Sequence, residues 1–280
     1  MKLLNSTYGK GRVRVMRLSG EGQNREVREL TVLAMLAGDI AQAYTQADNS
    51  TTVSTDTIKN VVNVVAREEL EAGPEAFCRA VAKRLLNSYP GMTSATVSAR
   101  EVRWNRLTVD GTPHPHAFTL DGNGQGTAEV VMDRDGDRVT SGLSGFTFLK
   151  ATASGWSNYI KDRYTTLPET EDRILATSME ASWRWSRDPA DFAAANARVL
   201  DALMRVFTMT YSYSAQDSLY RMGSAAIEAV PELENISIAC PNKHYVPINL
   251  GPFGLDNSNR VFSATDEPHG QIECTVGRWL

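Results

Sequence analysis

The same order of predicted elements occurs twice along this chain, and that repetition limits the fold more than any single motif does. In the first half, strands over residues 11–18 and 27–44 flank a turn at 21–24, two helices follow, and a second strand pair closes the half. Gly38-Asp39 within the long strand suits a bulge. The second half repeats strands, two helices and strands, although the residues themselves barely repeat. The pattern predicts an α+β fold of two tandem domains, each an antiparallel sheet with helices on one face.

Local signals define the helices and the second strand pair of the first half. Ser54 is a predicted N-cap, and Pro74 takes the first position of the second helix. Apolar residues follow each start at helical spacing. Two further strands begin near residues 95 and 114, and Asp110-Gly111 between them predicts a hairpin.

The second half is predicted with the same kinds of signal. Its elements are, in order, strands over 146–152 and 174–185, helices opened by Asp188-Pro189 and by Ser214-Ala215-Gln216-Asp217, and strands over 234–250 and 260–276. The acidic, turn-rich segment 133–137 predicts a boundary between domains of residues 1–137 and 138–280. Its Asp-x-Asp-Gly-Asp pattern lacks the terminal glutamate of a calcium loop, so a hairpin or linker is favoured over a metal site.

Composition excludes several functional classes. A net charge of −4 with interspersed signs gives no basic face for nucleic acid or for a membrane surface. Three scattered cysteines suggest neither a disulfide framework nor a zinc knuckle. No apolar run approaches the roughly 18 residues of a membrane span, and no signal peptide is evident. The ending Arg278-Trp279-Leu280 is not the Ser-Lys-Leu peroxisomal address, so a cytoplasmic location is expected.

The segment 241–245 carries the first candidate residues. Pro241 and Pro247 interrupt a strand-like run, which predicts an edge, a bulge or a kink. Asn242 and His244 are two residues apart and therefore share one face of extended chain. An amide beside an imidazole can position and move protons. The alternative is a polar kink without chemistry.

Two helix starts and one arginine are further candidates. Thr55-Asp56 and Ala215-Gln216 take the same place in the two halves, and the free N–H groups of a helix start favour anions. The alternative for each is an ordinary capped helix. Arg173, at the mouth of a strand, can bind a planar anion through two hydrogen bonds. Its alternative is an ion pair with Glu169 or Asp172.

Two other segments offer weaker signals. Lys10 lies between glycines, which leave it reachable, but the segment lacks the spacing of a phosphate-binding P-loop. His114 and His116 share one face as half of a metal site, yet no further residue with ligand spacing accompanies them. A structural or loop role is favoured for this pair, and no metal site is predicted.

Eight short motifs, taken in order, resemble those of the urate oxidase family, bacterial type. They are Tyr8-Gly9-Lys10, Ala47-Asp48-Asn49-Ser50, Ser54-Thr55-Asp56-Thr57-Ile58-Lys59-Asn60, His114-Pro115-His116, Tyr164-Thr165-Thr166-Leu167, Asp172-Arg173-Ile174-Leu175, Pro241-Asn242-Lys243-His244-Tyr245 and Cys274-Thr275-Val276-Gly277-Arg278. Each is weak alone, but their order from the first ten residues to the last ten is highly specific.

The resemblance implies two tandem tunnelling-fold (T-fold) domains per chain and a homotetramer around a central tunnel, with active sites shared between subunits. It also implies oxidation of urate by dioxygen and water to 5-hydroxyisourate and hydrogen peroxide, without a metal or organic cofactor. By position, Arg173 and Gln216 would clamp the purine in its plane, and the Ala215 N–H would add a contact. Thr55 and Asp56 of a neighbouring subunit would hold the other edge.

The same resemblance implies roles in catalysis. Lys10, Thr55 and His244 would relay protons, and Asn242 would lie over the ring at the dioxygen and water site. Where the family usually has a stacking phenylalanine, this chain has Trp156.

The tryptophan leaves alternatives open. Because an indole is larger than a phenyl ring, either the pocket is reshaped around Trp156 or Tyr159 lies nearer the purine. The nearest alternative enzyme is another T-fold pterin or purine enzyme, such as a cyclohydrolase or an aldolase, which needs a different nucleophile or zinc. Tight zinc binding by His114 and His116 would favour it. A catalytically silent purine-binding scaffold is the alternative from another class, and the retained relay residues argue against it.

Overall fold

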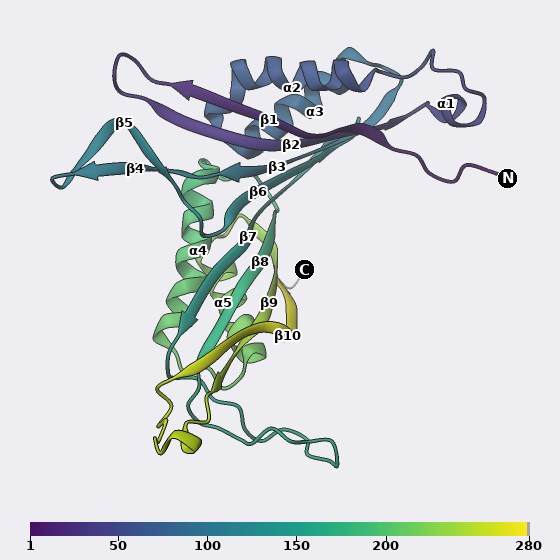
Figure 1. The fold of residues 1–280 in the computed structure, drawn as a ribbon. Coiled ribbons are helices and arrows are strands. Elements are labelled where there is room, and N and C mark those ends of the chain that lie inside the picture. Colours follow the sequence, from purple (N-terminus) through teal and green to yellow (C-terminus); the bar gives the residue numbers. More distant parts are fainter. Residues whose placement is uncertain (279–280) are drawn as a thin grey trace. The chain divides into compact units, whose positions relative to one another are not determined.

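A computed structural model describes residues 1–278 of the chain, so the last two residues of the ending discussed above, Trp279 and Leu280, lie outside the described residues. The predicted α+β class is confirmed, because antiparallel strands and helices are both present (Figure 1). Two compact units can be distinguished. The first unit consists of residues 1–143 and 184–193, and the second of residues 144–183 and 194–280. The domain boundary between residues 137 and 138 stays a prediction.

The first unit is an antiparallel sheet with two helices on one face. Its elements are β1 (Tyr8–Ser19), β2 (Glu26–Gly38), α1 (Ala41–Thr45), α2 (Thr55–Glu69), the 3-10 turn η1 (Leu70–Ala72), α3 (Pro74–Ser88), β3 (Met92–Val102), β4 (Trp104–Val109), β5 (Thr112–Leu120), β6 (Gln125–Met132) and the start of β7 (Asp137–Lys150). The strand order is β1-β2-β3-β6-β7, and β4 pairs with β5 in a separate two-stranded sheet.

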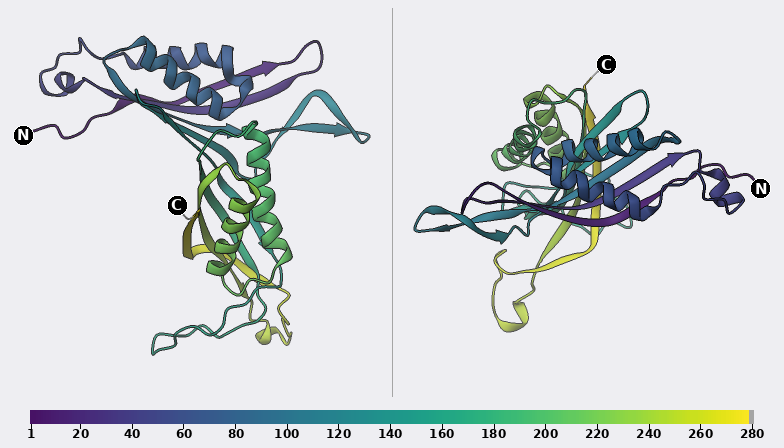
Figure 2. Two further views of the ribbon diagram at one scale, coloured as in Figure 1. Left: turned by 180° about the vertical axis from the view of Figure 1, so that it is seen from behind. Right: turned by 90° about the horizontal axis from the view of Figure 1, so that it is seen from above.

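The alternation of apolar residues explains the core of this unit. Every second residue of β2 from Leu30 to Leu36 is fully buried, as expected for a strand with one covered face. Phe77, Val81 and Leu85 form a buried stripe on α3 at helical spacing. Helices α2 and α3 both cover that face of the sheet (Figure 2).

The second unit repeats the arrangement. It contains the remainder of β7, β8 (Leu175–Trp185), α4 (Phe192–Met209), α5 (Ala215–Ala229), β9 (Leu233–Pro247), the 3-10 turn η2 (Gly251–Phe253) and β10 (Phe262–Gly277), with the strand order β7-β8-β9-β10. Helix α5 packs on β9 and β10. A Cβ atom on Gly223 of α5 would lie 2.8 Å from Val276 Cγ2, so the glycine permits this close approach.

One predicted strand was too long. The strand expected over residues 27–44 ends at Gly38, and the short helix α1 begins at Ala41. A Cβ atom on Gly38 would lie 2.3 Å from the carbonyl oxygen of Gly91, so the backbone is packed tightly against another segment there. The end of β2 therefore depends on a contact with a segment some fifty residues further along the chain.

The second strand pair was also predicted incorrectly. The Asp110-Gly111 hairpin forms, with both residues at positive φ, but it joins β4 to β5 and not two strands of the main sheet. The neighbour of β3 is β6, which the sequence patterns did not indicate.

Three other boundaries can be compared with the predictions. Segment 133–137 makes the favoured hairpin, in which the Asp133 N–H donates to the Gly136 carbonyl. Strand β7 begins at Asp137 and not near residue 146, and α4 begins at Phe192, after the proline signal. Within residues 1–278, no helix is both long and apolar enough to span a membrane.

Candidate active site

Lys10 lies in the first unit, on β1 next to a glycine that the packing requires. A Cβ atom on Gly9 would be 1.9 Å from the carbonyl oxygen of Ala34, so no other residue fits without moving the strands apart. The pairing of β1 with β2 slips between Lys10 and Val13. Such a bulge redirects side chains locally.

The start of α2 places Thr55 and Asp56 near this lysine. Ser54 caps the helix, because its Oγ accepts a hydrogen bond from the Thr57 N–H at 3.1 Å. Thr55 and Asp56 are exposed at the first two helical positions. Lys59, through a hydrogen bond and its charge, and Lys10 to a smaller extent hold the pKa of the Asp56 carboxyl below its usual range. Lys10 and Asp56 are therefore close enough for their charges to interact.

The start of α5 in the second unit has the same construction. Ser214 Oγ accepts a hydrogen bond from the Asp217 N–H at 3.0 Å, and Ala215 and Gln216 occupy the first two helical positions. Ala215 is buried and Gln216 is exposed. The prediction that equivalent helix starts recur in the two halves is confirmed.

Arg173 is a half-buried cation without a carboxylate partner among residues 1–278. Glu169 pairs with Lys161 at 2.9 Å, and Asp172 accepts a hydrogen bond from the hydroxyl of Thr152. The Nε atom of Arg173 is buried and has no hydrogen-bond partner. Burial lowers the pKa of the Arg173 guanidinium, although arginine stays charged at neutral pH. The alternative of an ion pair with Glu169 or Asp172 is wrong.

Three segments interlock around Arg173 and together form what we call the site clamp: residues 153–156, 170–173 and 211–212. Five backbone hydrogen bonds join them: Trp156 N–H to the Thr170 carbonyl at 2.7 Å, Thr170 N–H to the Trp156 carbonyl at 3.0 Å, Arg173 N–H to the Ser154 carbonyl at 2.9 Å, Gly155 N–H to the Ser212 carbonyl at 2.9 Å and Ser212 N–H to the Ala153 carbonyl at 3.0 Å. The clamp is anchored to α5, because Ser218 Oγ donates to Ser212 Oγ at 2.7 Å.

Trp156 forms an aromatic platform within this clamp. Its ring centre lies 5.9 Å from the guanidinium carbon of Arg173. Tyr159 stacks on the indole, with ring centres 5.5 Å apart and planes inclined by 12°. The platform beside Arg173 is therefore formed by Trp156, with Tyr159 packed on its ring.

Asn242 and His244 lie on β9, where the predicted bulge is confirmed and the predicted edge is wrong. Strand β9 runs through Pro241 to Pro247 and is paired on both sides, so it is not an edge. The irregularity lies in β10, between the residues that pair with His244 and Asn242. The extra residues of this bulge in β10 therefore accommodate the irregular pairing opposite Asn242 and His244. Asn242 lines a cavity together with Cys240 and residues of α5, and His244 follows two residues later on the same strand.

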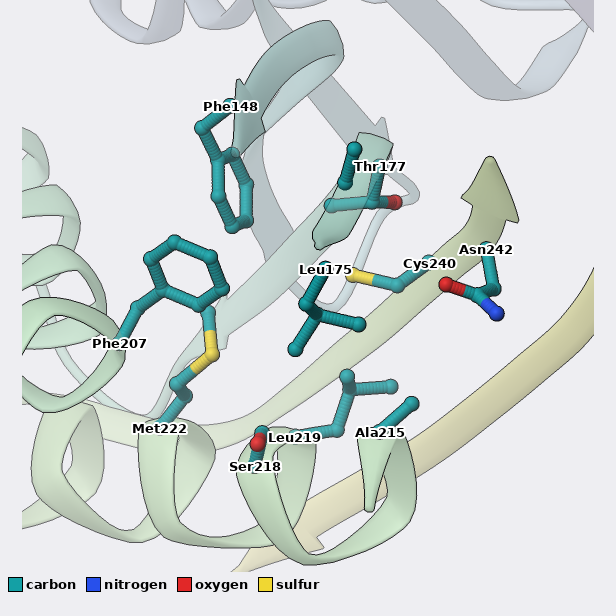
Figure 3. A pocket seen from close by; sticks show the side chains of 11 residues that line it. Phe148, Leu175, Thr177, Phe207, Ala215, Ser218, Leu219, Met222, Cys240 and Asn242 are labelled. Atoms are coloured by element: carbon teal, nitrogen blue, oxygen red, sulfur yellow. The ribbon is translucent and has the colours of Figure 1, made fainter. Parts of the chain in front are cut away.

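A small apolar cavity is lined by Asn242 and by the first turns of α5, among other residues (Figure 3). Its volume of ≈ 20 Å³ is room for about one water molecule. Cys240 lines it, and burial raises the pKa of that thiol to about 11. The cavity is too small for a bicyclic ligand and belongs to the packing behind Asn242.

The histidine pair of β5 does not form a metal centre with other residues of the described chain. The rings of His114 and His116 meet edge to face, 4.5 Å between centres. Within residues 1–278, no group of three or more His, Cys, Asp or Glu residues is placed to hold a metal ion.

Sequence reasoning missed Tyr211 and Ser212 of the site clamp. Tyr211 Oη donates to the Glu171 carbonyl at 2.6 Å, and Ser212 is almost fully buried. The segment Tyr-Ser-Tyr precedes an N-cap, and nothing in its spacing distinguishes it from an ordinary linker. Only the three-dimensional contact with residues 153–156 shows its role.

Comparisons with known proteins agree with one another. The profile of the family described as uricase matches residues 6–131 and 139–273. The chain is 37% identical to the uricase of Arthrobacter globiformis over 97% of its length and 88% of that protein, and 35% identical to the uricase of Aspergillus flavus over 97% and 95%. The crystal structure of the Arthrobacter globiformis uricase superposes with a TM-score of 0.94, covering 99% of this chain and 95% of that one.

Proposed function

The chain belongs to the uricase family, and from that membership we propose that it oxidises urate with dioxygen at a site that two copies of the chain complete. It is an oxidoreductase, and its substrate is urate. The finer statements below, on products, residue roles and assembly, are our proposal.

The unpaired guanidinium of Arg173 is the observation that carries the substrate class. A half-buried cation without a counterion is costly, and a planar anion that fills two of its hydrogen bonds removes that cost. Urate is such an anion. Gln216 adds directional hydrogen bonds beside it, the Ala215 N–H adds another at the helix start, and the Trp156 ring stacks on the purine.

The reaction needs an electron donor, and urate itself supplies the electrons. Urate, dioxygen and water give 5-hydroxyisourate and hydrogen peroxide: two electrons leave the purine and reduce dioxygen, and water adds a hydroxyl group to the ring. We propose that no metal or organic cofactor takes part. Lys10, Thr55 and His244 relay the protons, and Asn242 holds dioxygen or water over the ring.

The proposed groups fall into two clusters, one in each unit, and we propose that two copies of the chain bring such clusters together. Lys10, Thr55 and Asp56 lie in the first unit, while the groups around Arg173 lie in the second. The strand order begins with β1 and ends with β10, so each has an unpaired edge that a second copy can extend. We propose that the first unit of one copy faces the second unit of another, and that such pairs form a homotetramer around a tunnel.

The cell compartment belongs to the same proposal. Cys78 and Cys240 are buried free thiols, and Cys274 is also unpaired. A reducing bacterial cytoplasm suits these thiols.

The activity is tested with purified, chelator-treated protein. Loss of urate absorbance together with formation of hydrogen peroxide is expected, and turnover only after metal addition would overturn cofactor independence. Arg173→Ala should abolish binding of the non-reacting analogue azaxanthine. Lys10→Ala should keep that binding and lower kcat by about a hundredfold or more. Normal turnover by Lys10→Ala would reject the proton relay.

Site sharing is tested by co-expressing the two inactive variants. In mixed assemblies, a chain with intact Lys10 can face a chain with intact Arg173, so about a quarter of the sites should regain both groups when chains pair at random. Co-expression of Arg173→Ala with itself under a second tag is the matched control. Mixed assemblies without recovered activity would show that each chain builds its own site.

A further inference from the structure

Tyr211 joins two segments of the site clamp, 211–212 and 170–173, through its hydroxyl group. Tyr211 Oη donates to the carbonyl of Glu171 at 2.6 Å, two residues before Arg173. The backbone carbonyl of Tyr211 accepts a hydrogen bond from Arg221 Nη2 at 2.6 Å. Arg221 is in turn paired with Asp217 in the first turn of α5. The hydroxyl group and the backbone carbonyl of Tyr211 are therefore both held by hydrogen bonds.

Gly155, the neighbour of Trp156, makes room for this hydroxyl. A Cβ atom on Gly155 would lie 2.3 Å from Tyr211 Oη and 3.0 Å from the Thr170 carbonyl oxygen. Gly155 is not among the glycines with positive φ, so space and not backbone conformation is the reason for a glycine here. The hydroxyl is wedged between the segment that carries Trp156 and the segment that carries Arg173.

Arg173 depends on such support because no carboxylate orients it. Its side chain has neither an ion pair nor a hydrogen bond at Nε within the described chain, so its direction follows from the backbone that bears it. That backbone is held by the Ser154 carbonyl on one side and by the Tyr211 contact two residues earlier. A shift of this segment would move the guanidinium away from the Trp156 platform.

We propose that Tyr211 is a positioning residue for purine binding, which sets the separation of Trp156 and Arg173 through its hydroxyl group. The inference rests on the proposed function, since the groups it positions are those proposed to bind urate. It adds a residue that does not touch the substrate and that acts through the two groups that do.

The first test compares Tyr211→Phe with Tyr220→Phe. Loss of one well-formed hydrogen bond should raise the urate KM, and weaken azaxanthine binding, about five- to tenfold, with kcat changed less than twofold. Tyr220 is 62% exposed on α5, so its phenylalanine variant should match the wild type. A purely structural role would lower the thermal midpoint and leave KM unchanged, and that result overturns the proposal.

The second test is a double-mutant cycle with Gly155→Ala. Alone, the added methyl group must displace the Tyr211 hydroxyl, so KM should rise at least as much as for Tyr211→Phe. In Gly155→Ala/Tyr211→Phe the contact at 2.3 Å is absent and the Thr170 carbonyl oxygen at 3.0 Å is the nearest atom, so KM should fall below that of Gly155→Ala alone. A double variant whose KM is as high as that of Gly155→Ala overturns the proposal. Because both proteins carry the same alanine, the comparison holds even if both fold poorly.

Wild-type protein separates the two levels of inference. Wild type that turns over urate while Tyr211→Phe keeps the wild-type KM rejects only the role of Tyr211. Wild type that neither oxidises urate nor binds azaxanthine rejects the proposed function and this inference together.

Discussion

A single hydroxyl group satisfies two buried partners in the first unit, and its removal is a sharp test of the packing. Ser141 Oγ on β7 donates to Glu75 Oε1 of α3 at 2.6 Å and accepts from Trp185 Nε1 at 2.9 Å. Ser141 is 1% exposed and Glu75 is 3% exposed, so water cannot replace the hydroxyl. Ser141→Ala deletes one oxygen atom and leaves the side chains around it unchanged in size.

The expected cost follows from what each partner loses. A buried hydrogen bond to a charged group contributes about 1.5–3 kcal/mol, and an orphaned buried N–H costs about 1–3 kcal/mol. Glu75 takes part in at least one further interaction, so the carboxylate loses only part of its stabilisation. Ser141→Ala should therefore lower the free energy of unfolding by about 2–4 kcal/mol.

Urea unfolding followed by tryptophan fluorescence measures this loss. Wild type and variants are compared at equal protein concentration, because assembly makes the midpoint depend on concentration. Ser144→Ala on the same strand is the matched control: its hydroxyl lies 3.2 Å from the exposed Glu180, which also accepts from the Gly145 N–H. The control should stay within about 0.5 kcal/mol of wild type. A Ser141→Ala protein as stable as this control would refute the reasoning.

Two further predictions concern single charged side chains. Lys150 Nζ donates to the carbonyls of Phe207 and Thr210 at the end of α4, at 3.2 and 2.9 Å. Lys150→Met should therefore lower the free energy of unfolding by about 1–3 kcal/mol in the same assay. An unchanged urea midpoint would contradict a capping role for Lys150. Burial raises the pKa of the Glu101 carboxyl. A raised folded-state pKa means that stability is present below the unfolded pKa, about 4.3, and is lost as pH rises through the folded pKa. Glu101→Gln should therefore gain stability relative to wild type as pH rises from about 4 to 7, and a constant difference across that range would contradict the sign.

Local sequence rules correctly predicted the features that depend on neighbouring residues. They failed for features that depend on contacts between segments distant in sequence. The helix starts at Ser54 and Ser214 were predicted correctly, because a cap and its helix lie within four residues. The end of β2 at Gly38 was not, since it depends on packing against Gly91. The pairing of β3 with β6 was missed for the same reason, as the hairpin signal at Asp110-Gly111 concerns only the chain between them.

The candidate site shows the same division. The resemblance named Arg173 and Trp156. In the structure, the guanidinium carbon of Arg173 lies 5.9 Å from the ring centre of Trp156. Whether Arg173 is free could not be predicted, because Glu169 lies near it in sequence and is occupied by Lys161 only in the folded chain. Tyr211 was missed since its contact, the backbone of residue 171, is distant in sequence and leaves no pattern.

The duplicated helix starts differ in charge at their second helical residue, and under the proposed function this difference gives the two halves unlike tasks. The second helical residue is Asp56 in α2 and Gln216 in α5. A carboxylate at the Gln216 position would repel an anionic substrate, whereas a carboxamide donates and accepts hydrogen bonds without charge. The acid that follows it, Asp217, is paired with Arg221. The second unit thus keeps Arg173 uncompensated for the urate anion, and the first unit, whose acid is compensated by lysine, can hold an edge of the purine without adding net negative charge.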